Sequence, residues 1–347
     1  MSCQNRPLTE LVLGAVKQRL LIKSATERFH TIAAAQPATT KRRPAPAALI
    51  ADFVKDLQAA MPEMAEAITA ASQREDRPSA AQIEALRVLL DLRPREVAHH
   101  PGPRLSLPVQ LPAEVTAWSA LLDLSEFRRQ GWTLVGGQMV HLLAWEHGEE
   151  SPRVTTDADV VLDVRAYQTA LQDVTQKLID SGFDEDGVSP DGIGHRYRHC
   201  QNTEAQVDVL LPEGVRVERY KTVTGARTIA AAGSVQALER SMRQKVAVGN
   251  RHGSIIRPDV RAALVAKAAA YQAERGTLIA ERHLRDFAYL TSLYARHYSA
   301  AELRERLTKK DRERIANALG SLLPANPAWR TVPNGLDARA LVVSVLH

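Results

Sequence analysis

The chain contains 347 residues, of which 45% are hydrophobic and 24% are charged. This composition excludes a disordered chain, a collagen-like fibre and a coiled-coil rod, and the length suffices for two or three globular domains. The net charge of +5 permits a polyanionic partner but does not by itself indicate one.

The sequence predicts a soluble cytoplasmic protein that does not contact a membrane. Its two cysteines, Cys3 and Cys200, cannot form a disulfide framework. No N-terminal stretch combines a basic region, an apolar region and a cleavage site, as a secretion signal does. Apolar runs such as 341–346 are much shorter than the roughly 20 residues that a transmembrane helix needs.

Helical periodicity dominates residues 1–92. Five prolines then fall between Pro94 and Pro112, where their missing N–H groups exclude a continuous helix or a central strand. We therefore expect a helical N-terminal region, with a Pro-rich linker at its end, over residues 1–110.

Beyond the linker, helical and extended patterns alternate, which predicts an α+β fold. The segment 111–250 is predicted to hold the sheet, and the segment 251–347 is predicted to form a helical C-terminal domain. The predicted helices are 112–130, 138–147, 167–181, 262–273, 281–297 and 300–323, and the predicted strands are 132–135, 158–164, one near Tyr197, and 206–211.

Two glycines follow the first predicted strand, in the run Leu134-Val135-Gly136-Gly137. Glycine permits a positive φ angle and a close approach of the backbone to a ligand, and the helix N-terminus behind it favours phosphate oxygens. The pattern alone is also compatible with an ordinary turn.

Acidic side chains concentrate in the middle of the chain, where residues 111–210 hold seventeen Asp or Glu against seven Lys or Arg. Asp157 and Asp159 occupy alternate positions of one predicted strand, so they point to the same face. Two neighbouring carboxylates repel each other and favour a cation between them, and Mg²⁺ prefers carboxylate oxygens. A solvent-exposed pair on an edge strand is the alternative.

A lone carboxylate interrupts the apolar strand 206–211 at Asp208. Asp is depleted in strand interiors because its burial without a partner is costly, so this position favours a third metal ligand. A strand-end Asp that bonds a turn is the alternative.

Together, the strand followed by Gly136-Gly137, the Asp157-x-Asp159 strand and the later Asp208 resemble the nucleotidyltransferase superfamily with a DNA polymerase β-type palm. The resemblance covers about residues 131–212. It implies a palm domain, a mixed sheet covered by helices, between the helical N-terminal and C-terminal regions.

The run Arg153-x-Thr155-x-Asp157-x-Asp159 is similar to the signature of the AbiEii/MenT-like nucleotidyltransferases, the toxins of type IV toxin–antitoxin systems. Lys267, in an Ala-rich helix, and Asp286, in Arg285-Asp286-Phe287-Ala288-Tyr289-Leu290, match the Lys and Asp of that family's C-terminal motifs. The chain departs from the pattern at Ala288 or Tyr289, where the family usually carries a further acid, and at Gly137, where many nucleotidyltransferases have Ser.

The resemblance implies two Mg²⁺ ions held by Asp157, Asp159 and Asp208, with Asp208 also helping to deprotonate the attacking hydroxyl group. It also implies that Lys267 offsets the charge of a bound NTP and that Asp286 orients Lys267 or the acceptor. The phosphates are expected to contact a second set of residues: Gly136, Gly137, Arg153 and Thr155.

The segment His195–Cys200 alternates histidines with arginines. Strand geometry places Arg196 and Arg198 on one face, where they are expected either to bind a triphosphate or an RNA backbone, or simply to face solvent. A zinc site is not favoured, because Cys200 would point away from His195 and His199.

These observations predict a Mg²⁺-dependent nucleotidyltransferase, of toxin type, that transfers NMP from an NTP to a tRNA 3′ end, another RNA or a protein. A cognate antitoxin is an expected partner. Two other functions remain open. One is a nucleotidyltransferase that acts on a small molecule such as an aminoglycoside, and the other is a non-catalytic module that binds a nucleotide or a partner.

Overall fold

The computed structural model describes residues 97–109, 111–150 and 153–346, which belong to one compact unit extending from residue 96 to residue 347. The helices predicted within 1–92 lie outside the described residues, as does most of the predicted N-terminal region 1–110. In the part of the chain that the structure describes, no helix is both long and apolar enough to cross a lipid bilayer.

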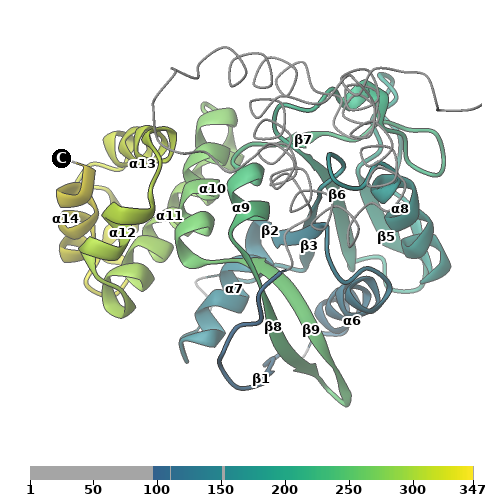
Figure 1. Cartoon of the computed structure of the whole chain (residues 1–347), viewed down its shortest axis with the longest axis horizontal. Helices are drawn as coiled ribbons and strands as arrows, with labels where there is room; N and C mark the ends of the chain where they lie inside the picture. Colours follow the sequence, from purple (N-terminus) through teal and green to yellow (C-terminus); the bar gives the residue numbers. More distant parts are fainter. Residues whose placement is uncertain (1–96, 110, 151–152, 347) are drawn as a thin grey trace, which may run out of the picture. The chain divides into compact units, whose positions relative to one another are not determined.

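A mixed sheet forms the centre of this unit (Figure 1). Its strands are β2 (Trp132–Val135), β3 (Asp157–Leu162), β4 (Phe183–Glu185), β5 (Arg196–His199), β6 (Gln206–Pro212) and β7 (Ala230–Ala231). Their order is β2-β3-β6-β5-β4, with β7 paired to β6 beside this path. β3 runs parallel to β6, whereas β2 is antiparallel to β3 and β5 is antiparallel to β6.

Helices surround the sheet, and the first three follow the predicted positions closely: α6 (Pro112–Phe127), α7 (Gly136–Glu146) and α8 (Ala170–Asp180). Sequence patterns did not predict the short α9 (Ser234–Glu239). α7 packs on β2 and β3, and α6 packs on β3 and α8. The α+β class expected from the alternating pattern is therefore observed in the described residues.

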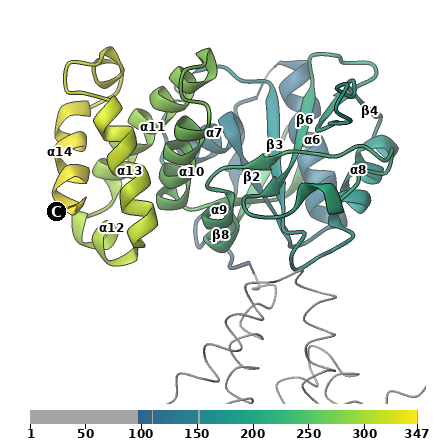
Figure 2. The ribbon, with the colours of Figure 1, turned by 90° about the horizontal axis from the view of Figure 1, so that it is seen from above.

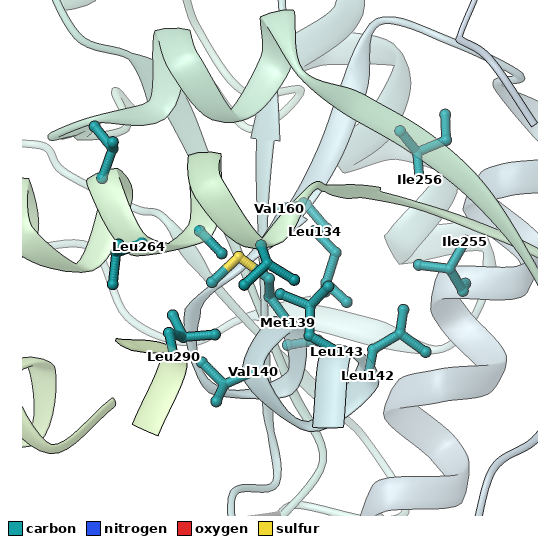
Figure 3. Packing of buried hydrophobic residues seen from close by; sticks show 14 of the residues in the cluster. Leu134, Met139, Val140, Leu142, Leu143, Val160, Ile255, Ile256, Leu264 and Leu290 are labelled. Carbon is teal, nitrogen blue, oxygen red and sulfur yellow. The ribbon is translucent and has the colours of Figure 1, made fainter. Parts of the chain in front are cut away.

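The two faces of the sheet differ in what they bury. Leu134, Val160 and Val209 point to one face and join the main hydrophobic core. Figure 3 shows Leu134 and Val160 beside Met139 and Leu143 of α7. The opposite face holds only a small apolar cluster, in which Val135, Val161 and Leu210 pack against Ala237 of α9. Because side chains alternate along a strand, the acidic residues of β3 and β6 share this second face.

A second sheet contains a hairpin that sequence patterns did not predict. Its strands are β1 (Leu105–Ser106), β8 (Ser241–Val248) and β9 (Arg251–Pro258), in the order β1-β8-β9. The segment 251–347, expected to be helical, therefore begins with a strand. The hairpin is anchored to α7, because Arg257 Nε donates a hydrogen bond to Glu146 Oε1 at 2.8 Å.

Helices make up the rest of the described chain: α10 (Val260–Ala273), α11 (Leu278–His297), α12 (Ala300–Arg306), α13 (Lys309–Ser321) and α14 (Gly335–Leu346). Figures 1 and 2 both show α10 and α11 between the sheet and these last three helices. Both α10 and α11 contact α7, so they bring residues of the C-terminal region next to the sheet.

The prediction of a single helix over 300–323 is wrong, because α12 ends at Arg306 and a separate helix, α13, begins at Lys309. Thr308 accepts a hydrogen bond from the backbone N–H of Asp311, and Asp311 accepts one in return from the N–H of Thr308. This reciprocal capping box satisfies N–H groups that have no partner at a helix start, so it begins a new helix within the periodic pattern.

Candidate active site

Asp159 and Asp208 lie side by side on the second face of the sheet. The parallel register of β3 and β6 pairs Asp159 directly with Asp208, and Asp157 with Gln206. On its other side, Asp159 is paired with Val135, the last residue of β2. The three acidic residues predicted from the sequence therefore gather where β2 ends.

Gly136 begins α7 immediately after this point and adopts a left-handed conformation, with φ of +68°. A β-carbon on Gly136 would lie 1.7 Å from Oδ2 of Asp159, so only glycine allows this approach. No side chain caps the N-terminus of α7. The first N–H groups of a helix have no acceptor within the helix, so they remain available to an anion.

Among the residues that the structure describes, the carboxylate of Asp159 accepts no hydrogen bond and forms no ion pair. Burial and the neighbouring charge of Asp208 raise the pKa of Asp159 to about 7. A bound cation would offset both effects and favour the ionised form of this carboxylate.

Asp208 differs from Asp159, because both of its carboxylate oxygens accept hydrogen bonds. Arg196 lies opposite Asp208 in the antiparallel register of β5 and β6. Its Nε donates to Oδ1 and its Nη2 donates to Oδ2, both at 3.1 Å, and Gln206 Nε2 donates to Oδ1 at 3.1 Å. His195 Nε2 lies 4.0 Å from Oδ2. The Arg196 pair is the two-pronged geometry in which guanidinium binds carboxylate most strongly.

Asp157 is partly buried at the start of β3, and the hydroxyl of Thr156 donates a hydrogen bond to its Oδ1 at 3.4 Å. In the described ranges, no group of three or more His, Cys, Asp or Glu side chains is close enough to hold a metal ion by itself. Mg²⁺ commonly uses only one or two carboxylates and completes its coordination with water and substrate phosphates. The uncompensated oxygens of Asp157 and Asp159 fit that donor chemistry.

A second charged group lies on α10 and α11, beside the sheet residues. Lys267 Nζ is 2.7 Å from Asp286 Oδ2, and both side chains are buried. Arg153 also binds Asp286, through Nε to Oδ1 at 3.1 Å and Nη2 to Oδ2 at 3.3 Å. Burial alone would raise the pKa of Asp286, but the charges of Lys267 and Arg153 outweigh this effect and lower it. The group therefore carries one net positive charge.

Gly137 connects the acidic residues of the sheet with the charged group of Arg153, Lys267 and Asp286. A β-carbon on Gly137 would lie 2.7 Å from Nη2 of Arg153 and 3.0 Å from Oγ1 of Thr155, so both side chains cover this glycine. Lys267 and Arg153 also act on Asp159, because their charges lower its pKa against the stronger effect of burial. Arg153, Thr155, Lys267 and Asp286 therefore lie next to the glycines and the acidic residues of β3.

Sequence patterns missed two histidines beside this region. His141, in α7, is buried with its Nε2 atom unpartnered, and burial lowers its pKa to about 4. His283, in α11, has an unpartnered Nδ1 atom, and burial lowers its pKa to about 4 as well. A usable indication existed in α7, where Gln138 and His141 are polar residues three positions apart among the apolar residues that precede Glu146.

The remaining residues that the sequence singled out lie on β5. Arg198 Nη2 donates to Asp186 Oδ2 at 2.6 Å, so each of the two arginines of this strand faces a carboxylate. Cys200 is exposed, and its Sγ lies 3.1 Å from Asp184 Oδ2, not against a histidine.

Comparison with known proteins adds one structural likeness. No family model matches the chain, and no curated protein matches it. The crystal structure of an antigenic nucleotidyltransferase-like protein from Paracoccidioides brasiliensis resembles it with a TM-score of 0.39 and 15% sequence identity, over 68% of this chain and 95% of that chain.

Proposed function

We propose that this protein is a Mg²⁺-dependent nucleotidyltransferase that transfers NMP from an NTP to an RNA acceptor. The observation that carries the proposal is the pairing of Asp159 with Asp208 in the sheet, directly beside the uncapped N-terminus of α7 at Gly136. Carboxylates for a cation and backbone donors for phosphates then face the same space.

Asp157 and Asp159 would hold Mg²⁺, and Gly136 and Gly137 would bind phosphate oxygens through their N–H groups. When bound, Mg²⁺ would polarise the α-phosphoryl group and stabilise negative charge on the leaving pyrophosphate. Lys267 and Arg153 supply one net positive charge next to this position, which would attract the triphosphate.

The acceptor hydroxyl oxygen would attack the α-phosphorus in line with the departing group. As the new P–O bond forms, the bond between the α-phosphorus and its bridging oxygen breaks, and pyrophosphate leaves with that electron pair. The proton of the hydroxyl group passes to Oδ2 of Asp208, which has one fewer hydrogen-bond donor than Oδ1.

An RNA acceptor is favoured by free positive charge next to the site. Arg282 and Arg285 of α11 are exposed, and within the described residues neither forms an ion pair. Arg285 is adjacent in sequence to Asp286, and Arg282 lies one helical turn before it. Exposed arginines are suited to phosphate groups of a polynucleotide.

The proposal also includes the toxin role that the motif resemblance implies. Three residues that carry the resemblance are far apart in sequence, but Arg153 and Lys267 both contact Asp286. We expect induced expression to stop bacterial growth and Asp159→Ala to restore it. A cognate antitoxin would be the partner that protects the natural host.

The direct test supplies full-length protein with Mg²⁺, total tRNA and each NTP in turn, labelled at the α-phosphate. We expect labelled RNA with at least one NTP, and a loss of at least a thousandfold in Asp157→Asn and Asp159→Asn. Asp163→Asn is the matched control, because Asp163 follows the other end of β3 and accepts a hydrogen bond from the N–H of Ala166.

The position of the label separates the remaining functions. If the label appears on protein, the acceptor is a protein and not an RNA. If it appears on an added aminoglycoside, the acceptor is a small molecule. If no NTP yields a labelled product of any kind, the enzyme proposal is wrong and a non-catalytic binding module is the better description.

A further inference from the structure

Arg196 binds the carboxylate of Asp208, which the predicted two-ion site would use as a metal ligand. It lies opposite Asp208 across β5 and β6, while Asp159 lies beside Asp208 across β3 and β6. Side chains at paired positions point to the same face of a sheet, so Asp208 stands between an unpaired carboxylate and a guanidinium.

The contacts of Asp208 leave little room for a divalent cation. Its two oxygens accept the two-pronged hydrogen bonds of Arg196, and Oδ1 also accepts one from Gln206. A metal ion bound there would have to displace these charge-assisted bonds and remain next to the displaced positive charge. Asp159 has neither a hydrogen bond nor an ion pair among the described residues, so it is the carboxylate that is open to a cation.

The local charge leads to the same conclusion. Asp157, Asp159 and Asp208 are three carboxylates, and the Arg196 guanidinium compensates the third of them. Among the described residues, the other two carboxylates form no ion pair, and together they match the charge of a single divalent cation.

We propose that this site binds one divalent cation, on Asp157 and Asp159, and that Arg196 takes the place of the second ion. The inference rests on the proposed function and departs from the two-ion site that the sequence predicts. Arg196 is then a positioning residue: its two hydrogen bonds hold the Asp208 carboxylate aligned beside Asp159.

The test counts bound metal ions instead of product. Full-length protein is titrated with Mn²⁺ alone, as a paramagnetic substitute for Mg²⁺, and the free ion is measured by its EPR signal. We expect one bound Mn²⁺ per wild-type chain, and none at this site in Asp159→Asn.

Two substitutions of Arg196 separate its charge from its bulk. Arg196→Gln keeps an amide donor for Asp208 but removes the charge, so a second Mn²⁺ should bind, at least tenfold more tightly than any second ion in the wild type. Arg196→Lys keeps the charge and should remain at one ion. Arg198→Gln is the matched control, because Arg198 lies on the same strand and pairs with Asp186 instead.

A further variant guards against a misfolded Arg196→Gln protein. Asp208→Asn should still bind one Mn²⁺, with up to about tenfold weaker affinity because Arg196 is then uncompensated, whereas a two-ion site would lose an ion. Two ions in the wild type, none in the wild type, or one ion in a folded Arg196→Gln variant would each overturn the inference.

The outcome is independent of whether nucleotide transfer occurs. One bound Mn²⁺ without transfer to any acceptor would leave the single-ion site standing and refute the proposed function. Transfer accompanied by two bound ions would do the opposite.

Discussion

Gly136 and Asp159 approach so closely that a side chain on the glycine would overlap the carboxylate, with 1.7 Å between its β-carbon and Oδ2. The glycine also has a φ angle of +68°, which other residues adopt at a cost. Backbone geometry at the start of α7 and the unpaired carboxylate of β3 therefore depend on each other.

Gly136→Ala should destabilise the protein by about 2–4 kcal/mol, because the strained φ angle and the overlap with Asp159 add together. Gly148→Ala is the control, since Gly148 has a similar φ of +71° but nothing within 4 Å of its β-carbon position. That variant should lose only about 1 kcal/mol. Urea unfolding of both proteins measures the difference, and equal losses would show that the contact with Asp159 is not close.

Asp159 should make stability fall as the pH rises from about 4 to 7. Burial raises its pKa from the ordinary 3.8 to about 7, so the folded state binds a proton that the unfolded state has already lost. Asp159→Asn removes this dependence. Above pH 7 the variant should be more stable than the wild type by about 1–3 kcal/mol, since the partial exposure of the side chain reduces the full effect.

Thermal unfolding at several pH values, without divalent cations, measures this gap. The stability difference between variant and wild type should be absent near pH 3.5 and should grow to a plateau above pH 7. A gap that stays constant from pH 4 to 8 would mean that Asp159 titrates normally.

Lys267→Met should destabilise the protein by about 2–4 kcal/mol, because it removes one of the two cations that pair with the buried Asp286 in the described part of the chain. Asp286→Asn should cost less once Lys267 is already replaced. A double-mutant cycle by urea unfolding should therefore give a coupling energy of about 1–3 kcal/mol.

The control is Lys309→Met, because the Lys309–Glu313 pair is exposed, with 93% of the lysine side chain accessible. It should change stability by less than about 0.5 kcal/mol. Additive effects of Lys267→Met and Asp286→Asn would show that the buried pair is not formed.

Arg257→Met should release the β8–β9 hairpin from α7. The Arg257 and Glu146 side chains are each only 3% exposed, so removing the arginine leaves a buried carboxylate without a partner, at a cost of about 3–5 kcal/mol. Replacing both residues by Met should recover part of that loss. Arg251→Met, which breaks the more exposed pair with Asp123, should cost under about 1 kcal/mol in the same unfolding assay.

Local sequence patterns were sufficient for much of the fold around the site. The strand at 132–135, the glycines that follow it and the alternation of Asp157 with Asp159 depend on neighbouring residues only. The same holds for the helices that carry Lys267 and Asp286, because their apolar periodicity extends over several turns.

Sequence patterns gave wrong or missing elements in two situations. In one, a local capping motif interrupted a helical periodicity, and in the other, the structure depended on pairing between strands. The Thr308–Asp311 capping box split a predicted helix, and the β8–β9 hairpin was missed because its strands do not alternate cleanly between polar and apolar residues. For Arg196, the sequence predicted a phosphate ligand or a solvent-facing residue. Its contact with Asp208 depends on the register between β5 and β6, which local patterns do not contain.

The sequence by itself determined which side chains share a face of a strand or helix, because that follows from the local backbone repeat. Only the tertiary structure decided that Asp159 meets Asp208, that Arg196 neutralises Asp208, and that Arg153 joins Lys267 on Asp286. Strand register and helix packing are set by contacts between distant segments, and the free energy of those contacts comes from burying surfaces that no single segment contains.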